Sequence, residues 1–295
     1  MWEWKPQDPS AWQWNESERR IEPVNVDGYE QGENEMSFRD IIGDEDTRVL
    51  RSDHNGYNLT VYPLHSIGAL NPDGTPDNAP NSGCTATKFG PRHLLTAGHC
   101  VNVGGLGSSA GWIDRDWWSG QDGMDQYFNA GDPSPNGVKN IEWYWVHPGW
   151  LNDKDDKYDY AVLMLFDNQN SCNFGWFGVQ TDGSLANTAH WHFGFPGNQV
   201  CEQSPHPADS CAQSMWGTER DIARTTIRFA FYPHDTQNGH SGGPLYEVIS
   251  GDRYIHAIHQ GPYSSSENQG VKVINSLVDN IVAVRNVHPS SYCSP

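Results

Sequence analysis

The chain has 295 residues, and its 37 acidic and 18 basic residues give a formal net charge of -19 at pH 7. Such an acidic surface repels phosphate groups, so we expect no nucleic acid partner. No apolar run approaches the roughly 18–20 residues of a membrane-spanning helix, so we expect no membrane partner either. The 30 Gly and 19 Pro favour short strands and turns, and the 13 Trp, 12 Tyr and 10 Phe supply bulk for a core.

Residues 1–39 differ in composition from the rest of the chain. They are rich in Trp, Glu and Pro and show no sustained hydrophobic period of 2 or 3.6. They form either a disordered leader or a propeptide that docks on the folded domain and is later cut away. We favour docking, because four tryptophans are costly to leave in water: Trp2, Trp4, Trp12 and Trp14.

From residue 40 onwards the pattern is that of a β protein. Residues 57–70 carry short apolar runs, residues 141–146 alternate as a half-buried strand does, and only Ser276–Arg285 has helical spacing. The regular turn signals favour a sandwich or paired barrels. Further strands are predicted at 93–97, 160–166, 190–195, 225–231, 245–249 and 254–258.

The six cysteines form no Cys-x-x-Cys pair, and an even, scattered set fits disulfides in an oxidising compartment. They are Cys84, Cys100, Cys172, Cys201, Cys211 and Cys293. Residues 1–6 lack the apolar core of a signal peptide. We therefore expect a secreted protein whose signal was removed ahead of this numbering.

The stretch Asn238-Gly239-His240-Ser241-Gly242-Gly243-Pro244 makes Ser241 a plausible nucleophile. Its glycines permit a tight turn that exposes the hydroxyl and directs successive N–H groups at one point, as an oxyanion hole requires. A serine nucleophile also needs a base, and the base needs a carboxylate to fix its tautomer. We select His99, which directly follows a buried strand, and Asp159, which heads the next core strand.

Three separated motifs resemble those of the chymotrypsin-like serine peptidases. They are Thr96-Ala97-Gly98-His99-Cys100, then His147-Pro148 upstream of Asp159-Tyr160-Ala161-Val162-Leu163, then Gly239-His240-Ser241-Gly242-Gly243-Pro244. The resemblance covers about residues 40–285. It implies an all-β fold of two six-stranded antiparallel β-barrels with a C-terminal helix, which divides residues 40–295 into subdomains at roughly 40–170 and 171–295.

The resemblance also implies the chemistry. His99 would be the general base, Asp159 its orienting acid and Ser241 the nucleophile of an acyl-enzyme, with the N–H groups of Gly239 and Ser241 as the oxyanion hole. It implies a Cys84–Cys100 disulfide and leaves the pairing of the other four cysteines open. We expect protein or peptide substrates, a monomer and no cofactor.

Within that superfamily the chain is most similar to the glutamyl endopeptidase branch. Phe193-Gly194-Phe195-Pro196-Gly197 resembles a turn of that branch, and Ala257-Ile258-His259-Gln260-Gly261 resembles the segment whose histidine binds glutamate in the S1 pocket. Thr236 falls where the branch places a hydroxyl in the same pocket. The resemblance implies that His259 and Thr236 receive the carboxylate of a Glu or Asp at P1.

At two positions the sequence departs from the pattern of the glutamyl endopeptidase branch, and this leaves alternative functions open. Gly243 follows the Ser241-Gly242 pair as in trypsin, and Asp235 has the spacing of the acid that gives trypsin its Arg/Lys preference. A trypsin-like preference through Asp235 is therefore one alternative, and a catalytically silent binding protein on the same scaffold is another.

Activation is also expected to differ from trypsin. His240 stands where trypsin-type zymogens have an acid, so the usual buried ion pair with a new amino terminus cannot form. By similarity to the branch's processed start, we predict propeptide cleavage between Arg39 and Asp40.

We predict no metal site. His190 and His192 lie on one strand face, but the sequence places no acid or cysteine beside them. Asp153, Asp155 and Asp156 lack EF-hand spacing and suggest a solvated loop.

Overall fold

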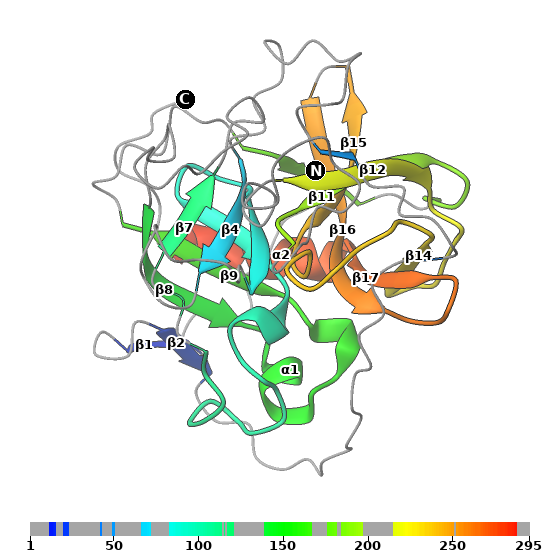
Figure 1. Ribbon diagram of the computed structural model, residues 1–295. Helices are drawn as coiled ribbons and strands as arrows, with labels where there is room; N and C mark the ends of the chain where they lie inside the picture. Colours follow the sequence, from blue (N-terminus) through cyan, green and yellow to red (C-terminus); the bar gives the residue numbers. More distant parts are fainter. Residues whose placement is uncertain are drawn as a thin grey trace, which may run out of the picture.

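The structure is a computed structural model in which two rings of antiparallel strands lie side by side (Figure 1). It describes residues 12–15, 20–23, 42, 49–50, 66–71, 83–113, 115, 117–120, 139–166, 176–181, 184–196, 215–250 and 252–287.

In the described chain the first ring has six strands, and it closes because β8 pairs with both β7 and β9. Closure pairs the two end strands of the sheet with each other, so that few edge groups stay unpaired. The strands are β4 (Ile67–Asn71), β5 (Cys84–Lys88), β6 (His93–Thr96), β7 (Trp117–Gly120), β8 (Lys139–Val146) and β9 (Ala161–Leu165).

Burial in the first ring explains why β9 is wholly apolar and why Leu94 and Leu95 form the centre of β6. Every residue of β6 and β9 is buried, and the register pairs Thr96 with Ala161 where the two strands end. In β8, Trp143 and Trp145 are fully buried, and Tyr144 is only 7% exposed. The expectation of a half-buried strand at 141–146 is therefore wrong: both faces of this strand are covered.

The second ring follows the order β14-β17-β16-β15-β11-β12. Its described strands close into a ring because β12 and β13 are two parts of one bent stretch, with β12 paired to β11 and β13 paired to β14. The strands are β11 (Ala189–Gly194), β12 (Trp216–Asp221), β13 (Arg224–Thr225), β14 (Phe229–Tyr232), β15 (Pro244–Ile249), β16 (Asp252–Pro262) and β17 (Asn268–Lys272). Two short strands attach to it, β3 (Val49–Leu50) on β12 and β10 (Gly178–Val179) on β16.

The helix predicted at the C-terminus is present as α2 (Asn275–Val287), which buries Leu277, Ile281 and Val284. Asn280 Nδ2 donates a hydrogen bond of 2.8 Å to the Tyr160 hydroxyl, so α2 leaves the second ring and packs against the first. No helix in the described part of the chain is long and apolar enough to cross a membrane.

Several elements differ from the sequence predictions. The stretch expected as one strand at 225–231 is interrupted at residues 226–228, where Phe229 N–H donates to the Thr226 hydroxyl and closes a turn. Strands β5, β12 and β17 were not predicted, and neither was the one-and-a-half-turn helix α1 (Pro148–Asp153), which begins with a proline capped by His147.

Two short strands come from the predicted leader. β1 (Trp12–Asn15) and β2 (Arg20–Pro23) form a hairpin, and β2 joins β8 in a parallel pairing at Arg20 and Tyr144 (Figure 1). The predicted cleavage site at Arg39–Asp40 and the cysteines at 172, 201, 211 and 293 lie outside the described residues.

Candidate active site

His99 and Asp159 are brought together where β6 and β9 meet. Asp159 is fully buried, and its two oxygens accept hydrogen bonds of 2.7 Å from the backbone N–H and from Nδ1 of His99. Because a carboxylate can only accept, the proton of the imidazole must lie on Nδ1. Nε2 of His99 is thereby left with its lone pair, the state that a general base needs.

A third donor to Asp159 was not predicted from the sequence. The side-chain amide of Gln260 donates from Nε2 to Asp159 Oδ2 at 3.1 Å and to the carbonyl of Asp156 at 2.8 Å. Both partners are acceptors, which fixes the orientation of the amide. Gln260 thus links β16 of the second ring to the buried acid of the first.

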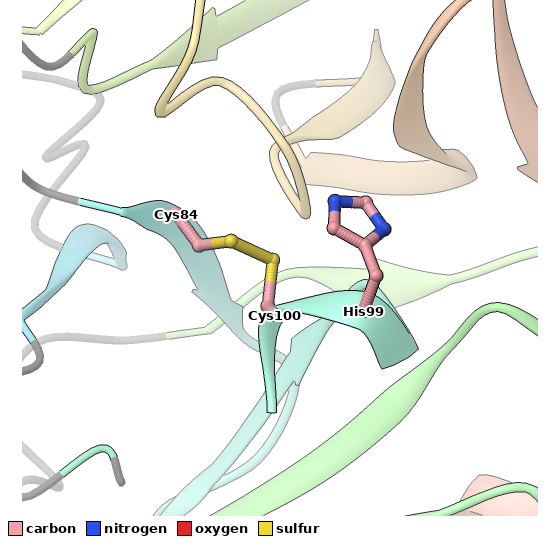
Figure 2. Close-up of side chains that lie close together, drawn as sticks. All are labelled: Cys84, His99 and Cys100. Atoms are coloured by element: carbon pink, nitrogen blue, oxygen red, sulfur yellow. A yellow bond between two sulfur atoms is a disulfide. The ribbon is translucent and has the colours of Figure 1, made fainter. Parts of the chain in front are cut away.

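The turn that carries His99 is held from two sides. A disulfide joins Cys100 in this turn to Cys84 on β5, as the family resemblance implies, and the imidazole of His99 projects from the same turn (Figure 2). On the other side the turn lies against Asp159 and Trp150, because a Cβ on Gly98 would sit 3.0 Å from atoms of each. A side chain at this position would crowd the buried acid and Trp150.

The loop around Ser241 has the backbone that its glycines predict. Gly239 and Gly242 have φ values of 102° and 82°, which residues with a Cβ rarely adopt. A Cβ on Gly242 would also lie 2.3 Å from the carbonyl oxygen of Thr85. The loop of residues 238–243 around the candidate nucleophile Ser241, called the nucleophile loop below, therefore packs directly on β5 of the first ring.

Thr85 makes the contacts that fix this packing. Its N–H donates to the carbonyl of Ser241 at 2.7 Å, and its hydroxyl donates to the carbonyl of Gly239 at 2.7 Å. The same hydroxyl accepts a hydrogen bond of 2.9 Å from the N–H of Phe195. The peptide groups that follow Gly239 and Ser241 are thus both oriented by one residue of the opposite ring.

The N–H groups of Gly239 and Ser241 form no hydrogen bond to a protein acceptor in the described structure, whereas His240 N–H donates to Gln237 at 2.9 Å. Two unengaged donors on one tight turn are the arrangement that stabilises a developing oxyanion. The Ser241 hydroxyl donates to the carbonyl of Gln260 at 3.3 Å, and no hydrogen bond to His99 is present among the described residues. Such contacts in free enzymes are often long and tighten with substrate.

Burial lowers the pKa of His99, but the charge of Asp159 and its hydrogen bond outweigh burial, so the net pKa is raised above the ordinary value of 6.5. A base with a raised pKa accepts a proton more readily. The imidazole is 22% exposed, so a substrate can reach it.

His240, at the position where trypsin-type zymogens have an acid, is held by polar contacts of its side chain. It is fully buried, its Nδ1 lies 3.1 Å from both the backbone nitrogen and the carbonyl oxygen of Gln237, and its Nε2 lies 3.2 Å from the carbonyl oxygen of Trp216. These contacts hold the turn that precedes Ser241.

His259 lies directly behind the nucleophile loop. Its N–H donates to the carbonyl of Gly243 at 2.9 Å, and its carbonyl accepts from the N–H of Gly242 at 2.8 Å. Its Nδ1 contacts the hydroxyl of Tyr232 at 2.6 Å, and that hydroxyl donates to the carbonyl of Gln269 at 3.0 Å. The hydroxyl must therefore accept from Nδ1–H, which leaves Nε2 as the nitrogen that can meet a ligand.

The imidazole of His259 is neutral in the free protein. Burial, followed by the nearby imidazoles of His192, His240, His99 and His234, lowers its pKa well below 6.5. The ring of His192 lies 4.8 Å from that of His259, and burial lowers the pKa of His192 to about 4.

The other two predicted S1 residues, Asp235 and Thr236, are 1% and 2% exposed. Asp235 Oδ1 accepts a hydrogen bond of 2.8 Å from the backbone N–H of Ile42, a residue 193 positions away in the sequence. This carboxylate is therefore engaged by the segment that precedes the first ring.

The comparisons with known proteins agree with this geometry. A family model described as trypsin matches residues 74–279, which is more than half of the chain. The chain belongs to the trypsin family. It is therefore a serine endopeptidase, a hydrolase of protein or peptide substrates, and the sequence-based prediction of the family and of its chymotrypsin-like fold is confirmed.

Two curated relatives span most of the chain. A glutamyl endopeptidase of Bacillus licheniformis is 27% identical over 259 residues, which cover 85% of this chain and 70% of the relative. A protein of Bacillus subtilis called extracellular metalloprotease is 28% identical over 244 residues, which cover 82% of this chain and 68% of the relative.

Solved structures of other proteases are also similar in fold to this chain. A Glu endopeptidase in complex with MPD has a TM-score of 0.64 and 24% identity, covering 83% of this chain and 99% of that structure. The protease Anisep from Arthrobacter nicotinovorans has a TM-score of 0.54 and 18% identity, with 75% and 97% covered. At these identities the likeness concerns the fold.

Thr85→Val should lower kcat/KM at least about tenfold, because it leaves the Gly239 carbonyl and the Phe195 N–H without their partner and loosens the nucleophile loop. The free energy of unfolding should fall by about 1–3 kcal/mol, the cost of buried unsatisfied groups. Peptidase kinetics and urea unfolding measure both effects.

The matched control is Thr87→Val on the same strand. Thr87 is 1% exposed, and its hydroxyl has no partner among the described residues, so this change should leave both quantities nearly unaltered. Equal kcat/KM in the two variants would contradict the role of Thr85.

Proposed function

We propose that the protein is a secreted serine endopeptidase that hydrolyses peptide bonds through an acyl-enzyme on Ser241 and prefers Glu, or Asp, at P1. His99 takes the proton of the Ser241 hydroxyl as the oxygen attacks the scissile carbonyl. The same proton then passes from Nε2 to the leaving amine. The buried carboxylate of Asp159 holds the tautomer and stabilises the imidazolium between these steps, as its 2.7 Å contacts with His99 support.

The oxyanion of each tetrahedral intermediate would be stabilised by the N–H groups of Gly239 and Ser241. Deacylation repeats the sequence with water in place of the amine. Thr85 supports this arrangement, since it binds the carbonyls of both donor residues.

The observation that carries the P1 proposal is the hydrogen-bonded chain from His259 to Tyr232 to the Gln269 carbonyl. It fixes the buried imidazole with Nδ1 protonated and Nε2 available. A glutamate side chain arriving at Nε2 would bring its charge and favour protonation of that nitrogen, giving a charge-assisted hydrogen bond. Thr236, five positions before Ser241, is the proposed hydroxyl partner.

The burial of Asp235 and its hydrogen bond with Ile42 argue against a trypsin-like preference for Arg or Lys at P1. A carboxylate that selects Arg or Lys must present its charge to the substrate. Asp235 is instead buried and accepts the N–H of Ile42. The glutamyl endopeptidase of Bacillus licheniformis among the relatives adds support for the acidic preference.

We further propose that residues 1–39 are a propeptide and that 40–295 is the peptidase domain, cut between Arg39 and Asp40. The new amino terminus at Asp40 would then lie two residues before Ile42, which contacts Asp235. Secretion is supported by the word extracellular in the name of the Bacillus subtilis relative and by the disulfide between Cys84 and Cys100. We expect the mature protein to be a monomer.

Ser241→Ala should abolish hydrolysis and covalent labelling by a fluorophosphonate probe while leaving the melting temperature within a few degrees of the parent chain. Mass spectrometry of the labelled protein reads out the site. Hydrolysis that persists in this variant would contradict the acyl-enzyme, and a parent chain that resists labelling would favour the catalytically silent alternative.

His259→Gln should lower kcat/KM for a Glu substrate at least about 100-fold and alter fluorophosphonate labelling of Ser241 only a few-fold, because the imidazole contacts the P1 side chain rather than the reacting bond. If kcat/KM for the Glu substrate and the labelling of Ser241 fall by similar factors, His259 has a structural role.

In the parent enzyme the ratio of kcat/KM for matched Glu and Gln substrates should fall as pH rises. The free-state pKa of His259 is well below 6.5, so the protonated form that pairs with carboxylate becomes scarcer at each higher pH, approaching tenfold per pH unit. The Gln substrate controls for the titration of His99, because both substrates share that step. A ratio that is constant between pH 5 and 9 would contradict the pairing.

A further inference from the structure

Three ligand-type side chains meet in the second ring, away from Ser241. His190 on β11, Glu247 on β15 and His256 on β16 each offer one nitrogen or oxygen, and these three atoms lie within 4.8 Å of one another. We propose that His190, Glu247 and His256 bind a zinc ion. The proposal is independent of the P1 preference.

The strand order brings the three residues together. β15 lies between β11 and β16, and the register that pairs Trp191 with Tyr246 continues to place His190 opposite Glu247. Between β15 and β16 the register shifts by one residue, so that His256 is the extra residue of a β-bulge. Bulges redirect a side chain out of the regular alternation. The bulge thus brings a second imidazole to the His190–Glu247 pair.

The two imidazoles have the separation that zinc requires. Nε2 of His190 and Nδ1 of His256 are 3.3 Å apart, and both side chains are buried, at 0% and 1% exposed. Zinc–nitrogen bonds of about 2.0–2.1 Å in tetrahedral geometry put two ligand nitrogens roughly 3.3–3.4 Å apart. The two nitrogens therefore already have the separation of a pair of zinc ligands.

The surroundings set the tautomer of His190 for metal binding. Its Nδ1 lies 3.0 Å from the carbonyl of Thr188, which can only accept, so Nδ1 carries the proton and the lone pair of Nε2 faces His256. A ligand histidine in metalloproteins typically donates its other N–H to a carbonyl in this way. Thr188 is thus the outer partner of the first ligand.

Charge and ligand type favour zinc over the alkaline-earth ions. Two neutral imidazoles and one half-buried carboxylate suit a borderline-soft divalent ion, whereas calcium and magnesium prefer sets made of oxygen ligands. Three protein ligands leave a fourth tetrahedral position for water. Without a metal, the same 3.3 Å contact would be a hydrogen bond from His256 Nδ1–H to His190 Nε2.

The ion would stabilise the part of the second ring that carries the candidate specificity residues. β11 carries His192 two residues after His190, and β16 carries His259 three residues after His256. A metal that joins β11, β15 and β16 would hold the bulge in place beneath these side chains. We therefore assign it a structural role, with no step of peptide hydrolysis passing through it.

The test uses the full chain carrying Ser241→Ala, which prevents self-digestion. The chelator-treated protein is titrated with Co²⁺ and Zn²⁺. We expect one equivalent of Co²⁺ to give the visible absorption of a tetrahedral site, one equivalent of Zn²⁺ to displace it, and bound zinc to raise the melting temperature.

Glu247→Gln and His256→Gln should each weaken metal binding at least tenfold and remove the tetrahedral cobalt spectrum. Glu219→Gln, an exposed carboxylate on the neighbouring strand β12, is the matched control and should bind like the parent. Glu247 is half-buried, so its variant keeps the test valid if His256→Gln fails to fold. Absence of stoichiometric binding, or equal binding in all variants, would overturn the proposal and assign the contact to a histidine–histidine hydrogen bond.

Discussion

The contact of Thr85 with the nucleophile loop is the constraint on which the rest of the site depends. One residue of the first ring binds the carbonyls of both Gly239 and Ser241, while Gly242 approaches the same strand too closely for any side chain. The serine and its two N–H donors belong to the second ring, and His99 and Asp159 belong to the first. The geometry of the candidate active site is therefore set by how the rings dock, and Thr85 fixes that docking beside Ser241.

Two residues of β16, His259 and Gln260, add further contacts around Ser241 and Asp159. Gln260 reaches from β16 to the buried carboxylate of Asp159, and the carbonyl of the same residue accepts the Ser241 hydroxyl. One residue further back, His259 is bound through its backbone to Gly242 and Gly243. The candidate specificity residue and the candidate catalytic residues are thus tied to one short stretch of β16. A change in the docking of β16 would consequently disturb P1 recognition and catalysis together.

The sequence predicted the parts of the fold and site that are encoded locally. Strand β9 is apolar throughout, Leu94 and Leu95 form the centre of the buried strand β6, and the glycines around Ser241 require a tight turn. The rest depends on partners distant in the sequence. Gln260 lies 101 positions from Asp159, and nothing in its neighbours marks an amide that donates to a buried acid.

The same limit explains one wrong prediction, on β8, and one grouping of side chains that the sequence did not indicate. His190 showed no acid nearby in the sequence, yet sheet register brings Glu247 beside it and a bulge adds His256, 66 positions away. Residues 141–146 alternate in sequence as a half-buried strand does, but Tyr144 is also covered, because it stacks on Trp112 and hydrogen-bonds to the backbone of Arg115. Sheet register and the packing of distant segments on a strand are tertiary properties that a period of two does not contain.

The most direct test of the central claim is a cleavage-site profile of the mature enzyme on a peptide library, read by mass spectrometry. The account predicts cleavage concentrated after Glu, with Asp second and few cuts after Arg or Lys, because His259 presents a protonatable nitrogen while Asp235 is occupied by Ile42. A profile dominated by Arg and Lys would contradict it and assign the specificity to Asp235.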